Sequence, residues 1–110
     1  MNTFKPELFL DFDKTISPVH GFHAAPSEKV VNSIKKLSEK YKIVIFSCRA
    51  NPDICSKPEA IAMVEYLNRY NIVYDEIYYR KPLYAVLIDD RAYNPTQMSW
   101  DDITNELLSD

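Results

Sequence analysis

Two aspartates separated by one residue follow an apolar run near the start of the sequence, Leu8-Phe9-Leu10-Asp11-Phe12-Asp13. Residues two apart lie on the same side of an extended strand, so both carboxylates point the same way if the strand continues through Asp13. Two neighbouring carboxylates repel each other unless a cation or a proton lies between them. A single aspartate here would be ordinary as a cap or turn residue, whereas the pair favours a metal site or an acid–base site.

Two later apolar runs also end in polar residues. Residues 42–46 lead into Ser47, with Arg49 close behind, and residues 85–88 lead directly into Asp89-Asp90. Carboxylates without sulfur or imidazole suit a hard cation, so the two acidic pairs favour Mg²⁺. Lys81 and the nearby arginines favour an anion, and a phosphate group suits both kinds of side chain.

These residue types together predict phosphoryl transfer. A carboxylate can attack phosphorus and form an aspartyl phosphate, and Mg²⁺ would offset the repulsion between that carboxylate and the phosphate. A second carboxylate can protonate the leaving oxygen and later accept a proton from water.

The elements that must position these residues follow from the hydrophobic pattern. Short apolar runs without alternation predict buried strands, and helical spacing of apolar residues after a serine or a proline predicts helices. The predicted strands cover residues 8–10, 42–46, 76–79 and 85–88, and the predicted helices run from Ser27 to about Lys40, from Lys57 to about Tyr70, and from Ser99 through Leu108.

Buried strands linked by helices indicate an α/β fold with a parallel sheet. We expect one domain over residues 1–110, a Rossmann-like three-layer αβα sandwich with strand order 3-2-1-4. That order sets Asp11 and Asp13 beside Asp89 and Asp90, with Ser47 on the other side, where strand order reverses and ligands bind.

The order of these residues resembles the haloacid dehalogenase (HAD) phosphohydrolase superfamily. Its pattern is DxDx[TV], a Ser or Thr after a second strand, a Lys, and an acidic pair after a later strand. Here the pattern is carried by Asp11-Phe12-Asp13-Lys14-Thr15, Ser47, Lys81 and Asp89-Asp90. The resemblance covers roughly residues 7–91 and implies a phosphatase that hydrolyses phosphoric monoesters.

The resemblance also implies a role for each residue. Asp11 would be the nucleophile and a metal ligand, and Asp13 the general acid/base that offers its backbone carbonyl to the metal. Ser47 and Lys81 would hold the phosphoryl oxygens. Asp89 would ligate Mg²⁺, with Asp90 beside it or acting through water. The further expected substrate contacts are Thr15, Arg49 and His23.

Two features set this chain apart from many relatives. Lys14 stands where many of them have glycine, and neither usual position holds a cap domain, because the loop after Thr15 and the segment 77–87 are both short. A capless chain is similar to small bacterial and phage members and to the phosphatase part of polynucleotide kinase–phosphatases. The Ser47-Cys48-Arg49 sequence and the segment 74–80 carry this second likeness.

Composition limits the partners. The net charge of -3 and pI of about 5.3 disfavour sequence-blind binding to nucleic acid, although a nucleic-acid end remains a candidate beside nucleotides and sugar phosphates. No apolar run reaches membrane-spanning length and the first residues form no signal peptide. Two cysteines outside any CxxC pattern predict free thiols in the cytoplasm. The sequence is compatible with a homo-oligomer.

Two other functions compete with the phosphatase. A catalytically weak, HAD-derived phosphate-binding module would keep the same residues without turnover. A phospho-receiver-like signalling domain has similar length, but it carries its acidic pair on the first strand and a lone aspartate on a middle strand, and here the middle run ends in Ser47. His20 and His23 could lie near the leaving group, but they could equally be solvated loop residues. Packing is favoured for Tyr78, Tyr79 and Tyr84 over stacking against a nucleobase.

Overall fold

The structure of the chain is a computed structural model that describes residues 4–84 and 86–109. Its three strands, β1 (Glu7–Leu10), β2 (Lys42–Phe46) and β3 (Glu76–Tyr78), form a parallel sheet in the order β1-β2-β3. Leu8 pairs with Ile43, and Ile45 with Ile77. The first three predicted strands and their relative order are therefore confirmed.

The three predicted helices are also present, as α1 (Glu28–Leu37), α2 (Lys57–Arg69) and α3 (Trp100–Leu108). The Ser27 hydroxyl accepts a hydrogen bond from the Val30 amide, and Ser99 caps α3 in the same way through Asp102. Helix α1 ends at Leu37, before the predicted end at Lys40, because the chain must turn into β2 at Lys42.

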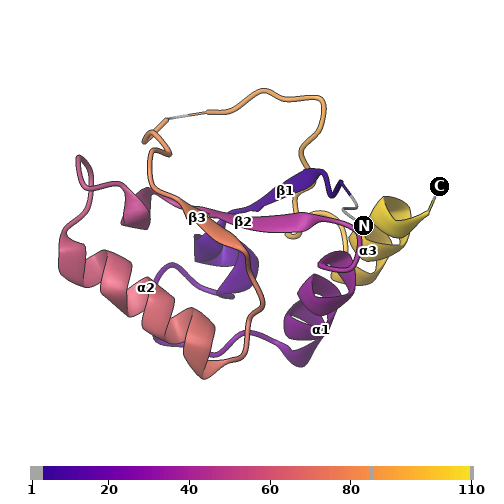
Figure 1. Cartoon of the computed structure of the whole chain (residues 1–110), viewed down its shortest axis with the longest axis horizontal. Coiled ribbons are helices and arrows are strands. Elements are labelled where there is room, and N and C mark those ends of the chain that lie inside the picture. Colours follow the sequence, from indigo (N-terminus) through magenta and orange to yellow (C-terminus); the bar gives the residue numbers. More distant parts are fainter. Residues whose placement is uncertain (1–3, 85, 110) are drawn as a thin grey trace.

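Helices α1 and α2 lie on the same face of the sheet (Figure 1). Right-handed crossovers explain this arrangement: the chain steps from β1 to β2 to β3 in one direction, so each crossover helix falls on the same side. Within residues 4–84 and 86–109, the α/β class and the parallel sheet of the expected three-layer sandwich are present, but the second helix layer is not seen. A right-handed crossover places its helix on the second face only when the chain moves along the sheet in the opposite direction. That would require a further strand on the other side of β1.

The core lies between the sheet and these two helices. It is built from the buried side chains of β1, β2, α1 and α2 and from the turn after β1, including Leu10, Phe12, Ile34, Ile43, Ile45 and Leu67. Close packing in this layer holds the strands in place and so fixes where their carboxyl ends lie.

The opposite face of the sheet carries a small aromatic cluster. The rings of Phe9, Phe46 and Tyr78 lie 5.1–5.8 Å apart, centroid to centroid. Phe9 is 45% exposed, so this face is only partly covered.

The predicted fourth strand is absent from the described residues. Val86, Leu87 and Ile88 lie in a long connection from residue 79 to 99 that arches over the sheet before α3 (Figure 1), and Ala85 lies outside the described residues. Their side chains are 75%, 55% and 95% exposed. The apolar pattern predicts a strand, but pairing depends on an edge far away in the sequence, which the local pattern does not fix.

None of the helices in the described ranges combines the length and apolar character needed to cross a bilayer.

Candidate active site

The turn after β1 presents both aspartates at the carboxyl end of the sheet. The chain coils through Phe12–Ile16 and buries Phe12 and Ile16 completely. Lys14 closes the turn with a φ of 57°, and its amide donates to the Val19 carbonyl over 3.1 Å. A positive φ favours glycine, which explains in physical terms why a glycine would suit this position.

Asp11 is half-exposed and paired with a buried lysine. The Lys81 ammonium lies 3.0 Å from Asp11 Oδ1, and the Lys81 residue is only 6% exposed. The Thr15 hydroxyl reaches the other carboxylate oxygen at 3.4 Å. Asp11 is therefore accessible to a ligand, while the buried Lys81 ammonium balances its negative charge.

Lys81 is held in position from two sides. Its ammonium lies 4.8 Å from the centre of the Phe46 ring and 5.5 Å from that of Tyr84. The Asn51 side-chain amide donates to the Lys81 carbonyl over 3.0 Å. The connection after β3 is thus fixed where it passes Asp11.

Asp13 is bound more tightly than Asp11. Arg49 donates from Nε to Oδ2 over 2.9 Å and from Nη2 to Oδ1 over 2.8 Å, and the Gly21 amide donates to Oδ1 over 2.7 Å. Burial alone would raise the pKa of Asp13, but the hydrogen bonds from Arg49 and Gly21 outweigh it, so the pKa lies below its ordinary value. In the free chain these hydrogen bonds hold Asp13 as an ionised carboxylate.

Arg49 connects three parts of the fold. Its remaining nitrogen, Nη1, lies 2.7 Å from a carboxylate oxygen of Glu59 in α2, and its guanidinium lies 4.7 Å from the centre of the Phe22 ring. The hydrogen bond with Asp13 raises the pKa of Arg49, which stays charged. The side chains of Arg49 and Asp13 are only 11% and 19% exposed, so this part of the network is largely shielded from water.

Ser47 directly follows β2, at the same edge of the sheet as the two aspartates. It is 1% exposed, and its hydroxyl accepts a hydrogen bond from the Arg49 amide over 3.2 Å. No acceptor for its own hydrogen is found among the described residues, so the hydroxyl can donate to an incoming anion.

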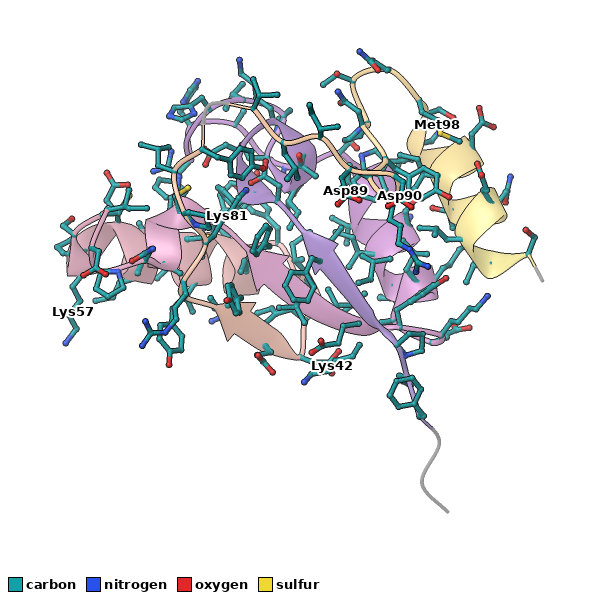
Figure 2. All side chains as sticks on the ribbon, turned by 90° about the horizontal axis from the view of Figure 1, so that it is seen from above. Lys42, Lys57, Lys81, Asp89, Asp90 and Met98 are labelled. Atoms are coloured by element: carbon teal, nitrogen blue, oxygen red, sulfur yellow. The ribbon has the colours of Figure 1, made fainter. Side chains whose placement is uncertain are left out.

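The structure gathers Asp11, Asp13, Thr15, Ser47, Arg49 and Lys81 at one edge of the sheet. It does not bring the second acidic pair to them. Asp89 and Asp90 are exposed on the connection to α3, where Asp89 Oδ1 accepts from the Arg91 amide, and Figure 2 shows the pair well apart from Lys81. His23 is exposed and makes no hydrogen bond with the cluster among the described residues.

Sequence reasoning missed three residues of the site: Glu59, which anchors Arg49; Phe22, which stacks on it; and Asn51, which ties down Lys81. Glu59 is visible in the sequence as the acid of the first turn of a helix, which has the ordinary explanation of the helix dipole. Nothing in the spacing distinguishes it from any other first-turn acid.

The metal-ligand set is incomplete in this arrangement. Mg²⁺ prefers about six oxygens in near-octahedral geometry, supplied by carboxylates, carbonyls and water. Among the described residues, no group of three or more His, Cys, Asp or Glu side chains could hold a metal ion. Asp11 and the Asp13 carbonyl suit such an ion by chemistry, but they do not form a full site alone.

Fold and site together define an α/β protein whose charged cluster lies at the carboxyl ends of a parallel sheet. No family model matches the chain, and no curated protein matches it significantly. The chain is similar to the crystal structure of an MCSG target from Vibrio cholerae, with a TM-score of 0.68 and 24% sequence identity over 93% of this chain and 95% of that chain. At that identity the likeness concerns the fold alone.

Proposed function

We propose that the chain is a Mg²⁺-dependent phosphomonoester hydrolase that works through a phosphoaspartate on Asp11, as the resemblance to the HAD superfamily implies. The observation that carries the proposal is the pair formed by half-exposed Asp11 and buried Lys81, 3.0 Å apart, with the buried Ser47 at the end of the neighbouring strand β2. An accessible carboxylate next to a shielded cation and a hydroxyl donor suits attack on a phosphate held by the other two groups.

The proposed reaction has two steps. An Asp11 oxygen bonds to phosphorus while the bond from phosphorus to the leaving oxygen breaks, and Asp13 delivers a proton to that oxygen. Water then attacks phosphorus, Asp13 takes the proton from the water, and Asp11 and inorganic phosphate are released. A substrate that draws Arg49 away from Asp13 removes the hydrogen bonds that keep its pKa low, which lets Asp13 carry the proton.

The proposal includes a fourth strand at residues 85–88, added to the outer edge of β1. Three apolar side chains that are 55–95% exposed support it, because burying a Val, Leu or Ile contributes about 1.5–3 kcal/mol. The chain is just long enough: the four residues from Lys81 to position 85 span at most roughly 14 Å, and a four-residue strand needs about 13 Å. The strand would end beside Leu10 and would bring the Asp89 carboxylate to Asp11 as a further oxygen ligand for Mg²⁺.

Two substitutions test the fourth strand. Ile88→Ser should lower the free energy of unfolding by about 1.5–3 kcal/mol if Ile88 becomes buried beside β1. Leu83→Ser is the matched control, since Leu83 is also largely exposed but lies outside the proposed strand. Equal, negligible effects of the two changes in urea unfolding, with and without Mg²⁺, would exclude the added strand.

Turnover tests the function itself. Hydrolysis of 4-nitrophenyl phosphate should require Mg²⁺, disappear in Asp11→Asn and persist in Asp53→Asn, an exposed acid outside the cluster. Rapid quenching followed by mass spectrometry should find phosphate on Asp11. Activity in Asp11→Asn, or in protein rigorously freed of metal, would refute the assignment.

The second candidate is a phosphate-binding module without turnover. It is favoured by the separation of Asp89 and Asp90 from Asp11 and by the tight pairing of Asp13 with Arg49. Such a module would bind inorganic phosphate through Lys81 and Ser47 and hydrolyse none of a panel of phosphorylated metabolites.

A further inference from the structure

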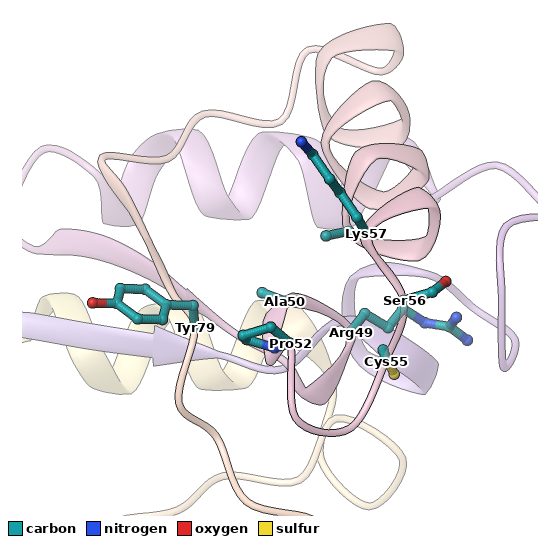
Figure 3. A pocket seen from close by; sticks show the side chains of 8 residues that line it. Arg49, Ala50, Pro52, Cys55, Ser56, Lys57 and Tyr79 are labelled. Atoms are coloured by element: carbon teal, nitrogen blue, oxygen red, sulfur yellow. The ribbon is translucent and has the colours of Figure 1, made fainter.

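A cavity of about 410 Å³ adjoins the candidate active site (Figure 3). Its walls come from the short 3-10 helix Cys48–Ala50, from the first turns of α2 and from Tyr79, which follows β3. This volume lies in the lower part of the range of small-molecule sites.

Arg49 forms the boundary between the cavity and Asp13. Arg49 lines the cavity, but its guanidinium points away from Pro52 and Tyr79 in Figure 3 and meets the Asp13 carboxylate instead. The leaving oxygen must lie at Asp13 in the proposed reaction. The cavity is therefore a hollow next to Asp13 into which the rest of a leaving group can extend.

The walls suit a flat, apolar ring. Ala50, Ala60 and Pro52 present methyl and ring carbons, and Tyr79, a residue that is 56% exposed, adds an aromatic ring. An exposed aromatic side chain at the mouth of a cavity offers a stacking surface, because every planar ring has a face to match it.

Two cations lie at the rim of the cavity. Lys57 lines the cavity from the first turn of α2, and the Arg80 guanidinium lies 5.4 Å from the centre of the Tyr79 ring. Neither cation has a carboxylate partner among the described residues, and the nearby Glu59 is bound by Arg49 instead. A lysine at the start of a helix is disfavoured by the helix dipole, so the fold itself gains nothing from Lys57 there.

We infer that this cavity binds the leaving group of the substrate, and that it selects a phosphomonoester whose leaving group carries a flat ring and a second negative charge. The inference rests on the proposed function and narrows its substrate class. Lys57 supplies the preference for the second charge, and Tyr79 the preference for the ring.

Two aryl esters that differ by one carboxylate test the charge preference. The kcat/KM for the charged ester, 6-carboxy-2-naphthyl phosphate, should be about two- to five-fold higher than that for 2-naphthyl phosphate. This ratio corresponds to the free energy that one partly exposed ion pair contributes. Lys57→Gln should bring the ratio to about one, with the difference in KM rather than kcat. Lys35→Gln, an exposed lysine of α1, should keep the wild-type ratio. Equal ratios in wild-type protein and Lys57→Gln overturn the role of Lys57.

A binding measurement without turnover separates this inference from the proposed function. The free leaving group, 6-hydroxy-2-naphthoate, should shift the backbone amide resonances of Ala50, Lys57 and Ala60, and Tyr79→Ser should weaken the effect several-fold. Shifts without hydrolysis of either ester would refute the proposed function and keep the ligand site. Absence of shifts at these residues overturns the inference, whether or not the esters are hydrolysed.

Discussion

The ion pair of Arg49 and Asp13 gives the sharpest quantitative test of the site. Its side chains are 11% and 19% exposed, and two of its hydrogen bonds are 2.9 Å or shorter. Exposed pairs couple by about 0.2–1 kcal/mol, and losing one partner of a fully buried pair costs about 3–5 kcal/mol. For this intermediate burial we expect a coupling free energy of about 2 kcal/mol between the two residues.

A double-mutant cycle measures that coupling. Arg49→Met, Asp13→Asn and the double variant are unfolded in urea at pH 7 in the presence of a chelator, which removes any contribution of bound metal. The pair Lys29 and Asp101 is the matched control, because its nitrogen–oxygen distance is also 2.8 Å but both side chains are more than half exposed. A coupling for Arg49 and Asp13 no larger than that of the control pair would refute the reasoning.

The same pair predicts a dependence on pH. The folded-state pKa of Asp13 lies below its unfolded value, so the folded state binds this proton less readily than the unfolded state. Its stabilising contribution is complete above the unfolded pKa of about 3.9 and is lost as the pH falls through the folded pKa. The free energy of unfolding of wild-type protein should therefore fall more steeply below about pH 4 than that of Asp13→Asn. Identical slopes would contradict this.

Three further outcomes follow from single residues. Lys14→Gly should raise the free energy of unfolding by about 0.5–1 kcal/mol, because glycine adopts the φ of 57° without strain; a loss of stability in urea would contradict it. Ser27→Ala should cost about 0.5–2 kcal/mol, since the Val30 amide loses its acceptor, and thermal unfolding measures this. Lys81→Met should leave the fold intact but lower kcat for 4-nitrophenyl phosphate about 10²-fold; unchanged kcat would remove Lys81 from the phosphate site.

The sequence was sufficient for the local elements of the fold. Helical spacing and serine caps located α1 and α3, and unalternating apolar runs located β1 and β2, because each signal depends on neighbouring residues. The end of α1 was overestimated because the pattern contains no glycine or proline that stops it. Residues 86–88 carry the same apolar signal as the other strands, yet they pair with nothing in the described part of the chain, since pairing is decided by a distant edge.

The site was predictable in its parts but not in its pairing. Residue type and order singled out Asp11, Asp13 and Lys81, and the structure brings Lys81 to Asp11. Arg49 was expected to contact the substrate, whereas in the structure it bridges Asp13 and Glu59. Which carboxylate an arginine meets depends on how α2 packs against the turn after β1, and no local pattern contains that information.

The contact between Lys81 and Asp11 joins residues that are 70 positions apart, and the contact between Arg49 and Asp13 joins residues 36 apart. Closing the longer loop costs only about 0.6 kcal/mol more entropy than closing the shorter one, provided the chain is otherwise free. The entropy of loop closure is therefore a minor reason why Lys81 needs an assembled sheet. The main reason is that the sheet and the turn after it supply the contacts with Phe46 and Asn51 that hold Lys81 in place. In hydrogen exchange, the amides around Lys81 should open before those of β2, and a bound phosphate should slow them most.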